Sequence, residues 1–184
     1  MNIVHISNIP RSININEFIS EKIIDWSIDI EFIYGSNFKN TKLLRDLVEV
    51  ICLELWIPSK EIPIFILIVD ELNNNAIEYW TEEGWYNKLR VKCAKSADSI
   101  SIIIEVEDTG KWKKHKNALE METLRAHQLK LWYNWHKSIR WRGLFMIIFN
   151  TVDRLYFKNT KLGWLIVWIK KKIKFDMLNC NLTK

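Results

Sequence analysis

Apolar and polar residues follow a regular pattern over the first half of the chain. Residues 27–34 alternate between the two kinds, which predicts a β-strand. Apolar side chains then recur at helical spacing, at Leu43, Leu44, Leu47, Val48, Ile51 and Leu55. This spacing predicts an amphipathic helix that is capped by Ser36 or Asn37 and ends before Pro58. A second helix is expected over about residues 61–79.

The second half of the chain predicts more strands than helices. Two β-branched segments, residues 88–94 and 100–106, are expected to form strands joined by a polar turn. A tight turn, residues 108–110, ends the second of these strands. Four further elements are expected: a basic segment that becomes helical over residues 111–138, a short apolar helix over 139–150, and closing strands over 152–157 and 162–173.

The expected order is strand, helix, helix, strand, strand, long lid, helix, strand, strand. This order fits neither a doubly wound nor an all-β fold. It predicts an α+β fold, a two-layer sandwich in which helices cover one face of a mixed, mostly antiparallel sheet, with a long lid. The length of the chain predicts a single domain, which is expected to cover residues 27–173. Residues 1–26 are too irregular to assign and are expected to be an amino-terminal arm or an extra layer, and residues 174–184 a tail.

Charge and composition narrow the function. The 27 basic and 22 acidic residues leave a net charge of +5, and the excess lies mainly in residues 111–116 and 170–174 rather than along one helix. This distribution argues against nucleic-acid binding. The three cysteines show no metal-ligand or CxxC spacing, which indicates free thiols in a reducing compartment. The longest apolar run, residues 62–69, contains Pro63 and is too short to cross a membrane, and no leader is evident. We therefore expect a cytoplasmic protein.

The most informative motif lies in residues 68–79, where the carboxylate of Glu71 comes four residues before the amide of Asn75. Residues four apart share one face of a helix, so the two groups can converge on one magnesium-bound phosphate. The spacing alone also fits an ordinary solvated helix face. Two further motifs favour the nucleotide site, because DTGKW (residues 108–112) and RWRGLFMI (residues 140–147) follow in order at the ends of expected elements.

Together the three motifs resemble those of the ATPase superfamily of gyrases, chaperones, histidine kinases and mismatch-repair proteins. VDELNNNAIEY is similar to the asparagine-bearing box of this superfamily, DTGKW to its first glycine box and RWRGLFMI to its second. The short chain and the segment LRDLVEVICLELWIPSKE are most similar to bacterial anti-sigma factor serine kinases. The resemblance covers residues 27–172. It implies a Bergerat-type ATP-binding fold, with ATP and Mg2+ as cofactors.

The resemblance also implies roles for the residues of the first two motifs. Glu71 would be the general base that orients the attacking hydroxyl group, and Asn75 would be a magnesium ligand that bridges the phosphates. Asp108 would accept a hydrogen bond from the adenine amino group. Gly110 would let the backbone approach the base, because it has no Cβ.

The second glycine box would bind the phosphates. Gly143 and Leu144, at the start of the expected helix, would offer backbone N–H groups to the triphosphate, as helix N-termini do for anions. Arg140 and Arg142 would add positive charge there, although long charged side chains of this kind also serve solubility alone.

By the same resemblance, the protein would bind a sigma factor and transfer the γ-phosphoryl group of ATP to a serine of an antagonist, the anti-anti-sigma protein. Family members often dimerise, so a homodimer is compatible with the resemblance. Two alternatives stay open. One is a non-catalytic ATP-binding adaptor, and the other is the detached catalytic module of a histidine kinase, although no phosphoacceptor helix precedes Asn37.

Tryptophan replaces glycine at several positions of these motifs. The first glycine box of the family has the form DxGxG, and its second glycine falls on Trp112. The second box commonly reads RGRGL, and its first glycine falls on Trp141. Trp56 and Trp80 also stand where relatives typically carry glycine. A side chain of about 200 Å2 in a phosphate-binding turn blocks the backbone and disfavours positive φ, so ATP should bind poorly to such a site.

Composition suggests an explanation for these replacements. The chain has 5 glycines and 10 tryptophans. Ordinary usage predicts about 13 glycines in a chain of this length, so the glycine deficit and the tryptophan excess offset each other. One hypothesis is that UGA codons that mean glycine have been translated as tryptophan. The other is a degenerate pseudo-enzyme whose tryptophans pack a core. UGG codons at positions 112 and 141 would contradict the first hypothesis.

Overall fold

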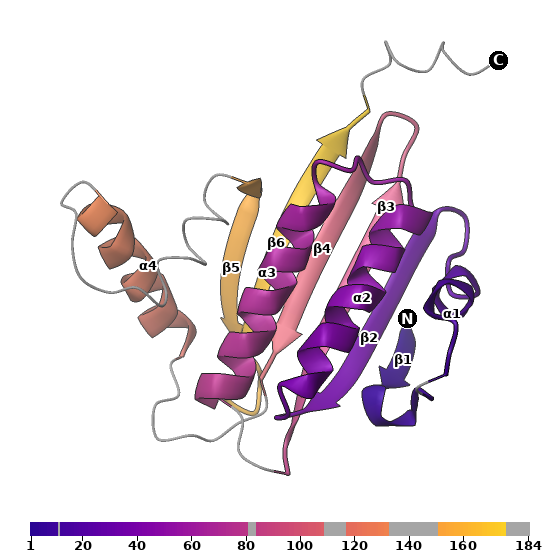
Figure 1. Cartoon of the computed structure of the whole chain (residues 1–184). Helices are drawn as coiled ribbons and strands as arrows, with labels where there is room; N and C mark the ends of the chain where they lie inside the picture. Colours follow the sequence, from indigo (N-terminus) through magenta and orange to yellow (C-terminus); the bar gives the residue numbers. More distant parts are fainter. Residues whose placement is uncertain (11, 81–83, 109–116, 133–150, 176–184) are drawn as a thin grey trace.

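The computed structural model describes residues 1–10, 12–80, 84–108, 117–132 and 151–175 (Figure 1). Within these residues the chain forms a six-stranded sheet and four α-helices. In chain order the elements are β1 (Asn2–His5), the 3-10 helix η1 (Ile6–Asn8), α1 (Ile15–Ser20), β2 (Ser27–Gly35), α2 (Lys39–Glu54), α3 (Ile62–Asn75), the π-helix η2 (Ala76–Trp80), β3 (Tyr86–Lys95), β4 (Ser99–Glu107), α4 (Ala118–Trp132), β5 (Arg154–Asn159) and β6 (Leu165–Lys174).

The sheet has the strand order β1-β2-β3-β4-β6-β5. β1 pairs with β2 in parallel, and each of the other neighbouring pairs is antiparallel. One row of aligned residues crosses four strands and is buried: Ile30, Val91, Ile104 and Ile169. Side chains alternate between the two faces along a strand, so the residues two positions before and after this row face the same side. This side of the sheet forms the core.

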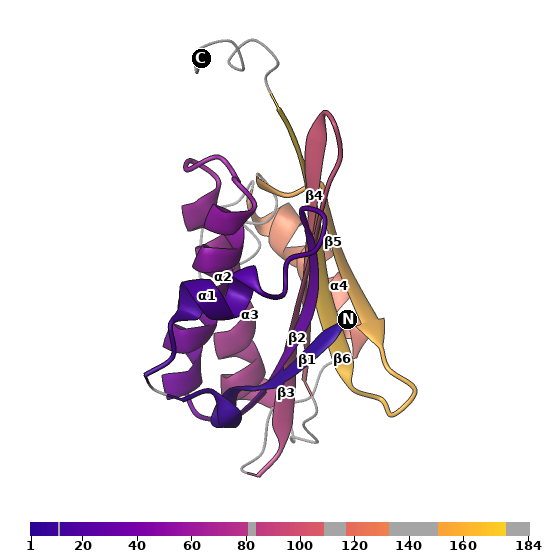
Figure 2. The ribbon, with the colours of Figure 1, turned by 90° about the vertical axis from the view of Figure 1, so that its right-hand side faces the viewer.

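Helices α1, α2 and α3 lie on the core side of the sheet (Figure 2). α2 buries Leu44, Leu47 and Ile51, whose spacing places them on one side of the helix. α3 buries Phe65 and Ile68 in the same hydrophobic core. The protein is therefore α+β with a mixed, mostly antiparallel sheet, as predicted, and its arrangement is compatible with a two-layer sandwich.

The predicted strands and the first predicted helix are confirmed in this fold. The segments 27–34, 88–94 and 100–106 form β2, β3 and β4, and the helix before Pro58 is α2. Neither expected cap holds the N-cap position of α2, which is Phe38, although Asn37 Oδ1 accepts a hydrogen bond from the Lys39 N–H at 2.9 Å directly before the helix.

The two closing strands are also present, and both are shifted in position. The segment 152–157 corresponds to β5 and the segment 162–173 to β6, and both strands begin later than predicted. Residues 160–164 instead form the turn between these strands. There the Thr160 N–H donates to the Trp164 carbonyl at 2.8 Å, and Gly163 has a φ of +84°.

The amino-terminal 26 residues contribute to both layers. β1 extends the sheet beside β2, and α1 lies with the other helices (Figure 2). Asn14 caps α1, because its side chain accepts hydrogen bonds from two backbone N–H groups of the first turn. Ile6 and Ile19 are buried in the common core. The segment consists of two short pieces that join different layers, which explains its irregular apolar pattern.

Two predicted helices differ from their expected form. The helix expected over 61–79 is α-helical to Asn75 and then continues as η2, so the helix widens directly after the Glu71 and Asn75 motif. Within the segment 111–138, α4 covers Ala118–Trp132 and packs against β5. The helix predicted over 139–150 lies outside the described residues. In the described ranges, each helix is too short or too polar to span a lipid bilayer.

Candidate functional site

Most of the buried polar side chains lie at one end of the core. Among the described residues, six that are buried are polar or charged. Five of these belong to element ends that meet at the lower end of the molecule in Figure 1: the start of α2, the end of α3, the start of β3 and the end of β4. The five are Thr41, Asn73, Asn75, Asn87 and Asp108. Burying polar groups in an apolar core costs free energy, so such a cluster indicates a functional site.

One hydrogen bond in this cluster connects β2 with α3. The Tyr34 hydroxyl donates to Asn73 Oδ1 over 2.6 Å, and both side chains are buried. Burial raises the pKa of Tyr34 well above its ordinary value of 10.0, and the negative charge of Asp108 adds to this shift. Tyr34 therefore stays protonated as a donor, and Asp108 lies within electrostatic reach of it.

Removing this hydrogen bond should destabilise the protein. Tyr34→Phe leaves the Asn73 oxygen buried without its donor, which is expected to lower the free energy of unfolding by about 1–3 kcal/mol. Urea unfolding measures the change. Tyr156→Phe is the matched control, because the Tyr156 hydroxyl accepts an exposed hydrogen bond from Arg154 and its loss should cost less than about 0.5 kcal/mol. Equal losses in the two variants would contradict a special role for the buried pair.

The motifs did not single out Asn73 and Tyr34 as site residues. A signal for Asn73 was present, because it follows Phe65 and Val69 at steps of four residues and so falls on the buried side of α3. A polar residue in that position needs a buried partner. Tyr34 carries no comparable signal, since its alternation with polar neighbours is that of any core-facing strand residue.

Glu71 and Asn75 lie one helical turn apart on α3. Asn75 is 7% exposed, and its Nδ2 has no hydrogen-bond partner among the described residues. Glu71 is half-buried, and burial raises its pKa above the ordinary 4.5, with a further contribution from the charge of Asp70. Asp70 itself forms an ion pair with Arg45 of α2 at 2.9 Å. A buried amide can offer an oxygen to a hard cation and N–H groups to an anion, so this pair fits a metal-bound phosphate.

Asp108 lies at the end of β4 and is 1% exposed. Its backbone N–H donates to the Leu165 carbonyl at 3.1 Å, which ties the end of β4 to the start of β6. Asp108, Tyr34 and Asn73 are thus brought together, and Asn75 lies on the same end of α3. The other residues predicted for the site lie outside the described ranges: Gly110, Trp112, Arg140, Trp141, Arg142, Gly143 and Leu144.

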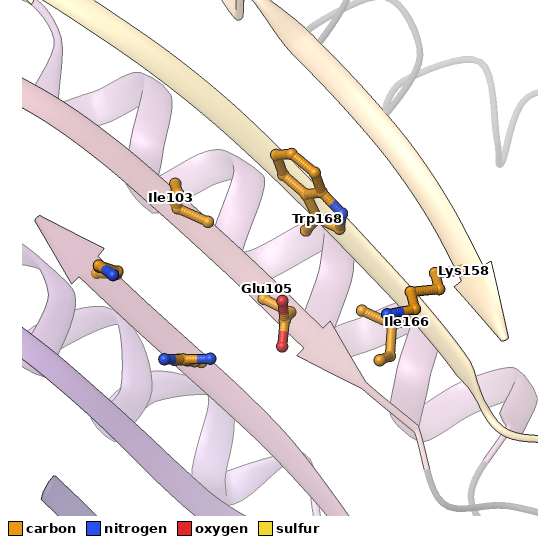
Figure 3. A pocket seen from close by; sticks show the side chains of 7 residues that line it. Ile103, Glu105, Lys158, Ile166 and Trp168 are labelled. Atoms are coloured by element: carbon orange, nitrogen blue, oxygen red, sulfur yellow. The ribbon is translucent and has the colours of Figure 1, made fainter. Parts of the chain in front are cut away.

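A hollow lies on the face of the sheet opposite the core. It has a volume of about 440 Å3 and is lined by Arg90, Lys92, Ile103, Glu105, Lys158, Ile166 and Trp168 (Figure 3). Asp29 binds Arg90 through two hydrogen bonds of 2.8 Å. Burial raises the pKa of Glu105 above 4.5, although the positive charge of Arg90 opposes this shift. The side chains that line this hollow are all at least partly exposed, and Arg90 is already paired. The buried polar cluster is therefore the stronger candidate site.

No protein-family model matches this sequence, and no curated protein matches it significantly. The motifs and the buried polar cluster are therefore the basis on which the site is interpreted.

Proposed function

We propose that the protein is an ATP-binding regulatory protein that resembles anti-sigma factor serine kinases and has the Bergerat-type fold of their superfamily. The observation that carries this proposal is the cluster of buried polar residues at one end of the core. Two of its members, Asn75 and Asp108, are 33 positions apart in sequence and belong to two different motifs. Both residues are buried, and the ends of α3 and β4, to which they belong, lie at the same end of the molecule (Figure 1).

Each of the described residues would have a distinct task. Asn75 would hold Mg2+ through its amide oxygen, and Asp108 would accept a hydrogen bond from the adenine amino group. Glu71 would orient and deprotonate a serine hydroxyl of the antagonist protein. The metal, when bound, would neutralise negative charge on the triphosphate. Tyr34 would hold Asn73, and through it the end of α3, against β2.

The remaining parts of the proposal come from the resemblance alone. Gly110 would allow close approach of the base, and Gly143 with Leu144 would bind the phosphates through backbone N–H groups. Arg140 and Arg142 would add positive charge. The partners would be a sigma factor and an anti-anti-sigma protein. The protein would form a homodimer and would be located in the cytoplasm.

A change at Glu71 tests the catalytic part. In a protein with glycine at positions 112 and 141, Glu71→Gln is expected to bind ATP within about threefold of its parent and to hydrolyse it about 100-fold more slowly, because the general base is lost. ATP hydrolysis by the parent should rise with pH through the pKa of Glu71, which lies above 4.5, because only the ionised carboxylate accepts the proton. Steady-state hydrolysis at several pH values measures both effects.

The control for this experiment is Glu49→Gln, which changes an exposed carboxylate on α2 and should leave hydrolysis unchanged. A Glu71→Gln protein with full activity and an unaltered pH profile would remove Glu71 from the mechanism.

A non-catalytic adaptor is the second candidate function. The observation that favours it is the tryptophan at positions 112 and 141, which fills the glycine boxes of the motifs. An adaptor would bind its protein partners equally well with and without changes at Glu71 and Asn75, whereas a kinase depends on both.

A further inference from the structure

Positive φ angles occur at few positions of the described chain, and tryptophan takes two of them. Gly84 and Gly163 have positive φ, as do three residues that carry a Cβ: Asp25 at 49°, Trp26 at 56° and Trp56 at 58°. The left-handed region is unfavourable for residues with a Cβ, and aspartate is among the few that tolerate it. Tryptophan has no such tolerance, so its presence at two of these positions requires an explanation.

Trp56 occupies the position after α2 where helices most often end with glycine. The Ile57 N–H donates to the Cys52 carbonyl at 2.9 Å, and the Trp56 N–H donates to the Leu53 carbonyl at 3.0 Å. These are the two hydrogen bonds of the Schellman motif, whose left-handed residue is usually glycine and which proline often follows, as Pro58 does here. The Trp56 side chain is 71% exposed, so core packing does not select it.

Trp26 occupies the second position of a two-residue turn. Ile24 and Ser27 exchange two backbone hydrogen bonds of 2.9 Å, and the two residues between them, Asp25 and Trp26, both have positive φ. A two-residue turn with two positive φ angles is of type I′, which strongly prefers Asn-Gly or Asp-Gly. With glycine at position 26, the turn would have the sequence Asp-Gly.

Contacts of the indole rings offer a competing explanation. The Trp26 and Trp56 rings meet edge to face with their centroids 5.7 Å apart, and Lys95 Nζ lies 4.2 Å from the Trp26 ring. Trp26 is 47% exposed and Trp56 is 71% exposed, and cation–π contacts at exposed sites are weak. The hydrogen bonds of both turns use main-chain atoms only, so glycine would make all of them without the strained backbone.

We infer that the natural protein carries glycine at positions 26 and 56, encoded by UGA codons that its own cell reads as glycine. Trp168 is a genuine tryptophan, because it lies half-buried in β6 and stacks on Tyr156 with ring centroids 4.4 Å apart. This inference does not depend on the nucleotide site, since both glycine positions lie at the other end of the helices and strands from Tyr34 and Asn75 (Figure 1).

The gene and the native protein test this directly. The coding sequence is expected to have UGA at codons 26 and 56 and UGG at codon 168. Peptide mass spectrometry of the protein from its own cells should then find glycine at both UGA positions. A UGG codon at position 26 or 56 would overturn the inference, and so would a native peptide with tryptophan at either position.

Stability measurements test the same inference through the backbone. Trp56→Gly and Trp26→Gly should each raise the melting temperature by about 2–4 °C. Each glycine variant should also melt at a higher temperature than the alanine variant at the same position, because alanine keeps a Cβ, for which positive φ is unfavourable. At position 168 the order of the melting temperatures should reverse. Trp168→Gly is expected to melt below Trp168→Ala, because glycine weakens a strand. Glycine variants at positions 26 and 56 that melt below both their alanine counterparts and the tryptophan protein would overturn the inference.

Discussion

A protein with glycine at positions 112 and 141 is expected to bind Mg-ATP at least about 100-fold more tightly than the protein with tryptophan there, a difference of ~2.7 kcal/mol. The physical reason is steric. A phosphate-binding turn presents backbone N–H groups to the anion, and glycine allows both the close approach and the positive φ that such turns use. An indole at either position would cover these N–H groups. Isothermal titration of both proteins with ATP, with and without Mg2+, measures the difference.

The control for this titration is a protein that has glycine at positions 26 and 56 and keeps tryptophan at positions 112 and 141. Both positions lie at the other end of the molecule from Asn75, so the control should gain stability without gaining ATP affinity (Figure 1). Weak ATP binding in the protein with glycine at 112 and 141 would contradict the proposed nucleotide site. It would leave the inference about positions 26 and 56 intact, since codons and melting temperatures test that one.

Asn75→Ala is expected to lower Mg-dependent ATP affinity by about 100-fold in the protein with glycine at 112 and 141, a loss of ~2.7 kcal/mol. Magnesium takes few ligands from protein, so one lost amide oxygen removes a large part of its attachment. We expect the Asn75→Ala protein to fold normally. The Asn75 Nδ2 is buried without a hydrogen-bond partner among the described residues, and removal of such a group is expected to leave stability unchanged or raise it.

Asn74→Ala is the matched control for this change. Asn74 is the neighbouring amide on α3, is only partly buried and interacts with the Thr41 hydroxyl at 3.4 Å. Its loss should change ATP affinity by less than about threefold, because a residue one position away points to another side of the helix. Titration in EDTA should remove the difference between the Asn75→Ala protein and its parent. Equal effects of the two alanine changes would contradict the assignment of Asn75 as the metal ligand.

The local pattern predicted most of the elements that carry the site. The apolar spacing of α2 and the alternation of β2, β3 and β4 are local properties, so these elements could be found in the expected places. The change from α-helix to π-helix after Asn75 could not be found in this way, because the pattern of residues 61–79 predicts one continuous helix. The parallel pairing of β1 with β2 was equally hidden, since residues 2–5 are too few to show a period.

The polar cluster shows the same division. Glu71 and Asn75 could be predicted as a pair, because they are four residues apart on one helix. The hydrogen bond from Tyr34 to Asn73 joins residues 39 positions apart, and the effect of Asp108 on Tyr34 connects the residue after β4 with β2. Neither contact follows from spacing, because both depend on the packing of α3 against the sheet.

The sequence by itself determined the period of each main helix and strand, the α+β class and the pairing of an acid with an amide on one helix turn, because these depend on residues a few positions apart. It also determined that tryptophan stands in excess and glycine in deficit. The tertiary structure decided which buried polar groups meet at one end of the core, because the packing of α3 against the sheet brings together residues that are far apart in sequence. The structure also showed positive φ at Trp26, in a tight turn, and at Trp56, at a helix end; of these two positions the motifs had marked only Trp56 as one where glycine is expected.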